Sequence, residues 1–111
     1  MTVKALAECP NLEHLDISYT KLATDEGFAA FEGKTLPIEY LGIVSLSEDV
    51  TSVGLAHLIT ACKDTLAICD CALMRQESLA KNEWSKALGL CFNLEYLDVS
   101  GNKGLTDDFF M

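Results

Sequence analysis

The sequence predicts an α/β repeat protein in which short strands alternate with helices. One leucine-rich segment returns at a nearly constant interval, and most of its returns are followed by a stretch typical of a helix start. The composition agrees, because half of the 111 residues are apolar and only 8% are aromatic. A soluble chain of this size and composition is expected to fold around one core.

The recurring segment is clearest at its first and last occurrences. Residues 12–18 read LEHLDIS and residues 94–100 read LEYLDVS. Related segments, IEYLGIV and LAICDCA, begin at Ile38 and Leu66, so the starts at 12, 38, 66 and 94 are 26, 28 and 28 residues apart. A period of about 20 to 29 residues is typical of leucine-rich repeats. We therefore expect about four repeats in one domain that covers residues 1–111.

Helices are expected between the strands. Residues 24–28 (TDEGF), 51–55 (TSVGL) and 105–110 (LTDDFF) recur as helix starts, with Thr or Ser placed to accept backbone N–H bonds at the cap. In the longest helix, apolar residues at helical spacing form a face that should pack on the strands. That face consists of Leu79, Ala80, Trp84, Ala87 and Leu88. The expected helices cover residues 2–9, 25–33, 52–61 and 76–90.

A cysteine precedes the clearest strands with fixed spacing to the leucines that follow. The pattern Cys-x-x-Leu-x-x-Leu-x-Leu, followed by Thr-Asp-x-Gly-Leu, resembles the cysteine-containing subfamily of leucine-rich repeats, found in F-box proteins and related to ribonuclease-inhibitor-type repeats. The match is strong at 9–28 and 91–110, fair at 36–62, and weak at 66–90, where Cys69 and Cys71 replace expected leucines. The resemblance implies a curved α/β solenoid, a horseshoe segment with parallel strands on its concave side and helices on its convex side. It implies no activity.

Alternation along each strand predicts which side chains face a partner. In residues 12–18, Leu15 and Ile17 should point into the core, so that His14, Asp16 and Ser18 point out. The same register places further outward residues in the other three strands. These are Tyr40, Gly42, Val44, Ile68, Asp70, Ala72, Tyr96, Asp98 and Ser100.

Two rows of these outward residues form the predicted binding surface. The first row is His14, Tyr40, Ile68 and Tyr96, and the second is Asp16, Gly42, Asp70 and Asp98. Carboxylates on neighbouring strands, about 4.8 Å apart, repel each other, and tyrosine is frequent in binding hot spots. We expect a basic, partly apolar protein partner. Two alternatives remain: the aspartates can bond to local backbone, and such solenoids also bind through their loops and lateral edges.

Charge and cysteine content limit the classes of function. The formal net charge of −9 opposes nucleic-acid binding, and no apolar stretch approaches the roughly 20 residues needed for membrane insertion. No secretion signal is visible at the start of the chain. The five cysteines, an odd number, fit a reducing compartment. We therefore expect an intracellular, cytoplasmic protein.

Catalysis, cofactors and metals have little support. The two histidines, His14 and His57, lie in no recognisable nucleophile motif, and no glycine-rich phosphate loop is present. We expect no enzyme activity and no cofactor. A small thiol or zinc protein is an alternative, because Cys69 and Cys71 lie close to Cys62. The spacing of one residue between Cys69 and Cys71 argues against it, and buried packing explains these thiols better, as it does for Cys9, Cys62 and Cys91 ahead of the strands.

The C-terminal end suggests a second contact surface. Phe109, Phe110 and Met111 fall where a further helix should begin, so the last repeat is expected to be truncated. Repeat solenoids need covered ends, and exposed apolar groups mark contact sites. We expect these three residues to form a docking edge, in a subunit or fragment of a larger, multi-subunit assembly. Substrate recognition in an F-box-type ubiquitin ligase is the alternative that the resemblance suggests, although no F-box is present.

Overall fold

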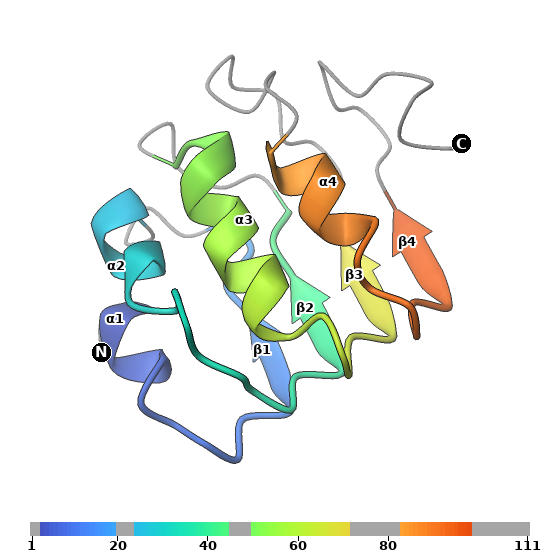
Figure 1. The fold of residues 1–111 in the computed structure, drawn as a ribbon, viewed down its shortest axis with the longest axis horizontal. Coiled ribbons are helices and arrows are strands. Elements are labelled where there is room, and N and C mark those ends of the chain that lie inside the picture. The colour runs from blue at the N-terminus through green and yellow to red at the C-terminus, as the bar shows by residue number, and fades with distance from the viewer. Residues whose placement is uncertain (1–2, 20–23, 45–49, 72–82, 99–111) are drawn as a thin grey trace.

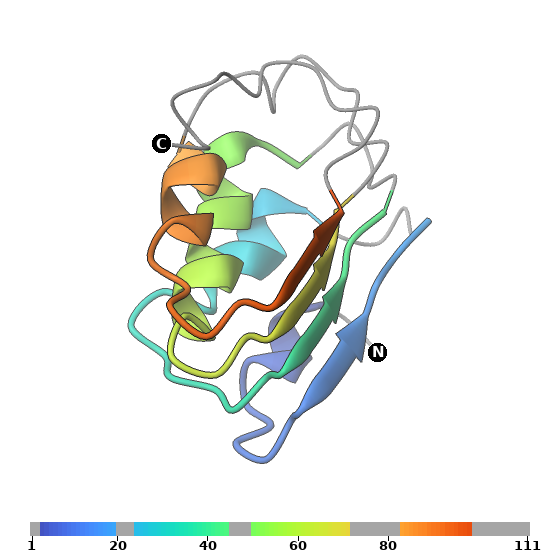
Figure 2. The same ribbon diagram turned by 90° about the vertical axis from the view of Figure 1, so that its right-hand side faces the viewer.

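The computed structural model describes residues 3–19, 24–44, 50–71 and 83–98. Four helices lie in one layer and four strands lie in the other (Figure 1). Figure 2 shows this arrangement from the side: the helices cover one face of the sheet, and no described helix covers the opposite face. The structure therefore has the α/β arrangement that the repeat pattern predicts.

The sheet is fully parallel, with its strands in sequence order. The strands are β1 (His14–Asp16), β2 (Tyr40–Gly42), β3 (Ile68–Asp70) and β4 (Tyr96–Asp98). Parallel neighbours require a crossover connection, and each such connection carries a helix on the same face of the sheet. The middle residues of the strands form one row, Leu15, Leu41, Cys69 and Leu97. The first three of them are buried, so this row faces the helices.

Where the structure describes the start of a helix, that start agrees with the sequence prediction. They are α1 (Val3–Leu6), α2 (Asp25–Ala29), α3 (Ser52–Ala61) and α4 (Glu83–Leu88). The hydroxyl of Thr24 accepts a hydrogen bond from the Gly27 amide at 3.2 Å. Thr51 accepts one from Gly54 at 3.4 Å. Both threonines act as N-caps because they satisfy backbone donors that have no partner within the helix.

Three of the helices are shorter than the sequence analysis predicts. Helix α2 ends at Ala29 instead of residue 33, because the next amides bond three residues back in tight turns, as Phe31 does to Phe28. Gly33 then takes a positive φ of 76°, which ends the turns. Helix α1 ends at Leu6 and is followed by similar turns. Helix α4 ends at Leu88, and the predicted residues before 83 lie outside the described part of the chain.

The core lies between the helices and the sheet. Trp84 is fully buried, and its backbone N–H donates to the hydroxyl of Ser52 at 3.0 Å, which links α4 to α3. Successive strand entries are linked as well, since the hydroxyl of Thr65 donates to the carbonyl of Ile38 at 2.7 Å. The largest fully buried side chains are Trp84, Phe28, Phe31, Ile38, Leu41, Ile43, Leu55, Leu58, Ile59 and Leu66.

Two predicted orientations are wrong. Val44, expected on the outward face, is buried, and its amide donates to the hydroxyl of Ser18. Cys9, expected to pack like the other cysteines that precede strands, is exposed, whereas Cys62 and Cys91 are buried. Cys9 follows the short helix α1 at one end of the sheet, and among the described residues no repeat precedes it to cover the thiol.

Candidate functional site

The candidate site is the sheet face that no described helix covers, here called the open face (Figure 2). Its residues occupy the first and third positions of each strand, on the side opposite the buried middle row. The strand registers align them as two rows. The first row is His14, Tyr40, Ile68 and Tyr96, and the second is Asp16, Gly42, Asp70 and Asp98. The structure therefore places together all seven residues that the sequence analysis assigned to partner binding.

The first row is aromatic and largely accessible. Tyr96 is 57% exposed and Ile68 is 39% exposed, which is high for apolar residues in a sheet. The rings of His14 and Tyr40 are stacked, with 4.2 Å between centroids and 7° between planes. Because His14 approaches from β1, the other ring face of Tyr40 is turned toward β3. This row therefore offers aromatic and aliphatic surface beside negative charge.

In the second row, Asp16 has a structural role. Its Oδ1 atom accepts a hydrogen bond from the backbone amide of Ser18 at 2.9 Å. The Ser18 hydroxyl in turn accepts from the amide of Val44 at 2.9 Å, which connects the end of β1 to the segment after β2. Part of the carboxylate row is thus scaffold, as the alternative interpretation of the sequence allowed.

Gly42 makes room for this arrangement. A Cβ atom at Gly42 would lie 2.8 Å from Oδ1 of Asp16 and 3.2 Å from Cε1 of Tyr40. The Asp16 carboxylate and the Tyr40 ring therefore lean over a position that has no side chain. Burial, followed by the negative charges of Asp16 and Asp70, raises the pKa of the Tyr40 phenol above its usual value. The phenol therefore keeps its proton to a higher pH than an ordinary tyrosine does.

Asp70 differs from Asp16 in how its carboxylate is satisfied. Its Oδ1 atom is buried and has no hydrogen-bond partner among the described residues. A buried polar atom without a partner has a free-energy cost, and most such atoms in folded proteins are paired. Asp70 is therefore the residue of the open face whose hydrogen-bonding capacity is most clearly unused within the described part of the chain.

An acidic rim lies just before the strands and was missed by the sequence analysis. Glu13, Glu39 and Glu95 each precede the first residue of a strand, and all three are exposed. The backbone carbonyl of Glu13 accepts the amide of Glu39 at 2.7 Å, and that of Glu39 accepts the amide of Ala67 at 2.9 Å. Their common position in the strings LEH, IEY and LEY was a signal that could have identified them. The rim adds negative charge next to the first row.

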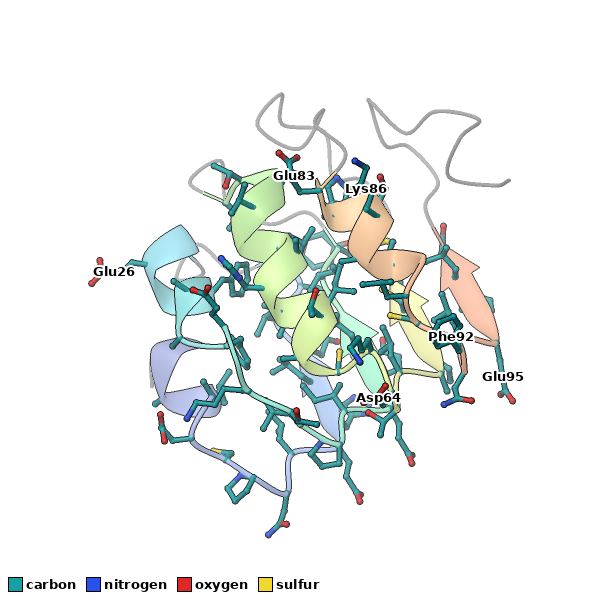
Figure 3. The ribbon with its side chains drawn as sticks, in the orientation of Figure 1. Glu26, Asp64, Glu83, Lys86, Phe92 and Glu95 are labelled. Carbon is teal, nitrogen blue, oxygen red and sulfur yellow. The ribbon has the colours of Figure 1, made fainter. Side chains whose placement is uncertain are left out.

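Phe92 is a second residue that sequence reasoning missed. It is 85% exposed in the turn between α4 and β4. Figure 3 shows its ring at the foot of β4, in the same region as Glu95. The following residue, Asn93, donates from its side-chain amide to the carbonyl of Asp64 at 2.6 Å, which holds this turn against the preceding one. The predicted docking residues Phe109, Phe110 and Met111 lie outside the described part of the chain.

Four of the five cysteines form a buried packing cluster. Cys62, Cys69, Cys71 and Cys91 are all buried. Burial and neighbouring thiols raise the pKa of Cys62 to about 12 and that of Cys91 to about 11. A hydrogen bond to Cys71, and then burial, raise the pKa of Cys69. Thiolate is the metal-binding and nucleophilic form, and the described residues contain no group of three or more candidate ligands suited to a metal ion.

A shallow hollow of about 260 Å³ lies on the helix side, away from the open face. His57 of α3 lines it, together with Lys34 and Lys63. These lysines pair with carboxylates, Lys34 with Glu8 at 3.3 Å and Lys63 with Asp64 at 3.1 Å. His57 lines the hollow without a cysteine or serine among the described residues around it. The described helices include none with the length and hydropathy to cross a bilayer.

Comparison with known families supports the repeat assignment. A family model described as leucine-rich repeat matches residues 8–31 and 90–108. These two matches, together with the parallel sheet and its helices, support a leucine-rich repeat protein. The description covers leucine-rich repeats in general and does not distinguish the cysteine-containing subtype. Searches of curated proteins and of solved structures gave no match.

The two matched segments contain the first and the last described strands, β1 and β4. Strands β2 and β3 fall between the matches, and they join the same sheet in register with the matched strands. Leucine-rich repeats are generally non-catalytic and mediate protein–protein interaction.

Proposed function

We propose that this chain is a non-catalytic protein-interaction module that holds a basic, partly apolar partner protein on its open face. The observation that carries the proposal is the joining of the two rows in one uncovered sheet face, with Tyr96 and Ile68 exposed beside Asp70. Aromatic surface gives binding energy with little loss of side-chain entropy. Carboxylates give charge complementarity to a cationic partner.

The proposal includes the larger setting in which the module acts. We propose a curved solenoid of about four repeats within residues 1–111, acting as a subunit or part of a multi-subunit assembly in a reducing, intracellular compartment such as the cytoplasm. Support comes from the 26- to 28-residue period of the sequence and from the buried, protonated thiols. A ligase role has no specific observation in its favour, and we do not propose it.

Site-specific crosslinking in an extract of the source cell tests the proposal. A photoreactive amino acid would replace Ile68 or Tyr96 on the open face, and Val53 as the control. Val53 is 51% exposed but lies on α3, on the other side of the molecule. We expect the same defined protein to be crosslinked from Ile68 and Tyr96, and not from Val53.

Competition makes the crosslinking result specific to the open face. An excess of unlabelled wild-type chain should abolish the crosslink, whereas the Asp70→Lys, Tyr96→Ala double variant should not. Crosslinks that form equally from Val53, or that the double variant competes away as well as the wild type does, would show that another surface binds the partner.

A further inference from the structure

We infer that the open face recognises an arginine side chain of its partner protein, with the guanidinium placed over Ile68, against the ring face of Tyr40 that His14 does not cover, and hydrogen-bonded to the half-buried carboxylate of Asp70. This inference rests on the proposed function and makes it more specific. It names the chemical group recognised and the residues that recognise it, which the general preference for a basic partner does not.

The aromatic part of the argument starts from the stack in the first row. His14 covers one face of the Tyr40 ring at 4.2 Å. The register places Ile68 beside Tyr40 on the other side, and Tyr96 beyond it. With strands about 4.8 Å apart, the two tyrosines are separated by roughly 9.6 Å along the row. The intervening residue, Ile68, is aliphatic and accessible, so a flat group can lie above it in contact with tyrosine.

The polar part of the recognition site is the half-buried carboxylate of Asp70. It belongs to the second row, next to Ile68 and close enough to Tyr40 for its charge to raise the pKa of the phenol. Asp16, on the other side of Tyr40, already accepts the Ser18 amide. Oδ1 of Asp70 is covered and has no partner among the described residues. The residue as a whole is only half-buried, so a donor from outside can approach its carboxylate from the open face without displacing a hydrogen bond to Oδ1.

The charge around this position favours a cation. Glu39 and Glu95 of the acidic rim flank the first row, and Asp16 and Asp98 belong to the second row with Asp70. The lysines whose side chains are described lie elsewhere: Lys34 and Lys63 are paired with other carboxylates, and Lys86 lies on α4 (Figure 3). A cation from a partner therefore meets negative potential without competition from these lysines.

Arginine fits this set of contacts better than lysine does. A guanidinium is planar, so it can stack on tyrosine while the N–H groups at its edge donate to a carboxylate. It is also more weakly hydrated, which lowers the cost of placing it over an aliphatic side chain such as Ile68. An ammonium group is a compact, strongly hydrated charge that makes the carboxylate contact but not the stack. The pairing of a ring face with an unpartnered carboxylate therefore selects for the guanidinium.

Two peptides of equal charge test the inference directly. The first is a blocked peptide containing three Gly-Ser-Arg units, and the second has lysine in place of each arginine. Titration into the ¹⁵N-labelled chain, followed by amide shifts at Tyr40, Ile68 and Asp70, gives both affinities. We expect the arginine peptide to bind about threefold or more tightly than its lysine twin.

Single substitutions test whether the arginine preference depends on the proposed residues. Asp70→Asn should weaken the arginine peptide by about fivefold and reduce the difference between the peptides. Tyr40→Leu removes the ring face but keeps an apolar side chain, and it should lower the arginine preference alone. Asp64→Asn is the matched control, since it removes the same charge from an exposed carboxylate away from the open face. It should leave both affinities within about twofold, as expected for a screened surface charge.

The outcomes separate this inference from the proposed function. Equal affinity for the two peptides, absence of binding by either, or an arginine preference that survives in Asp70→Asn would overturn the inference. If crosslinking from Ile68 yields a partner whose attached segment has no arginine, the interaction module stands and the arginine inference falls. If crosslinks come only from Val53, both fall.

Discussion

The imidazole of His14 lies flat against the phenol ring of Tyr40, with 4.2 Å between the ring centroids and 7° between the planes. The two residues belong to neighbouring strands and occupy the same register position. The stack holds Tyr40 over Gly42, beside the carboxylates of Asp16 and Asp70. It therefore connects the stability of the sheet to the shape of the surface proposed for binding.

Removal of the stack should lower stability by a small, measurable amount. We expect His14→Ala to reduce the free energy of unfolding by about 0.5 to 1.5 kcal/mol, the range for aromatic pairs on a sheet. His14→Phe should restore most of the loss, because it keeps a ring against Tyr40. Urea unfolding followed by the fluorescence of the single tryptophan, Trp84, provides the measurement. If the two variants were equally destabilised, stacking would not be the cause.

Gly42→Ala should destabilise the sheet through a close contact with Asp16. The new Cβ would lie 2.8 Å from Oδ1 of Asp16, whose position is held by the Ser18 amide. We expect a loss of about 1 to 3 kcal/mol, typical of overpacking. The loss should shrink when Asp16→Ala is introduced first, and a double-mutant cycle measures this coupling. Gly33→Ala serves as control: its cost comes from a positive φ, so it should be independent of Asp16.

Ser52→Ala should weaken the junction between α3 and α4. The Ser52 hydroxyl is buried and accepts the backbone N–H of Trp84, a donor in the first turn of α4. Loss of the hydroxyl removes this partner from the buried Trp84 N–H, which should lower the free energy of unfolding by about 1 to 3 kcal/mol. Val53→Ala, at the exposed neighbouring position, should change stability by less than about 0.5 kcal/mol. Similar losses in the two variants, measured by urea unfolding, would contradict a specific role for the hydroxyl.

The buried thiols should make the fold sensitive to alkali. Burial raises the pKa of Cys62 from 9.0 to about 12. Between these two values the unfolded chain loses a proton that the folded chain keeps. The free energy of unfolding contributed by this thiol therefore falls as pH rises above 9, by up to about 1.4 kcal/mol per pH unit. In Cys62→Ala, the decline in stability between pH 9 and 10.5 should be shallower than in the wild type.

The control for the thiol experiment is Cys9→Ala, which removes an exposed thiol. This variant should show the full wild-type decline in the free energy of unfolding over the same pH range. If Cys62→Ala and the wild type declined in parallel, the raised pKa of Cys62 would not contribute to alkaline unfolding.

Asp70→Asn should weaken partner binding without lowering the stability of the fold. The carboxylate has a buried oxygen without a partner among the described residues, so loss of its charge should be neutral or raise the free energy of unfolding by about 0.5 to 1 kcal/mol. Asp16→Asn provides the comparison and should destabilise the fold, because Asp16 accepts the Ser18 amide. Thermal unfolding of the two variants checks the difference. A large loss of stability in Asp70→Asn would mean that its carboxylate supports the fold.

Much of the fold follows from local patterns in the sequence. The repeat period and the alternation of LEHLDIS predicted the strand registers, since a period of two determines which side chains share a face. Thr24 and Thr51 predicted two helix starts, because capping depends only on a hydroxyl and the next few amides. The end of α2 was predicted less well, since the turns that replace its last residues depend on packing around Phe28 and Phe31 as well as on propensity.

The sequence predicted which residues belong to the candidate site, but not which contacts their side chains make. His14, Tyr40, Asp70 and Tyr96 could be assigned to one face from their register alone. The acidic rim was missed because Glu13 and Glu95 precede the strands, where alternation no longer determines direction. Val44 was misplaced for the same reason, since it lies beyond the end of β2. Partner binding at these residues stays a prediction that the experiments above address.

The sequence by itself determined the strand–helix order, the rows of the open face and the inward position of the four thiols after Cys9, because each depends on periodicity and short-range chemistry. Only the tertiary structure decided which aspartate carboxylate accepts a hydrogen bond within the fold. Asp16 is held by an amide of its own strand end, whereas Oδ1 of Asp70 has no partner among the described residues. It also decided that Tyr40 leans over Gly42 against His14. The contacts of Tyr40 with His14 and of Gly42 with Asp16 join strands that are far apart in the chain, and side-chain positions between such strands depend on how the whole sheet packs.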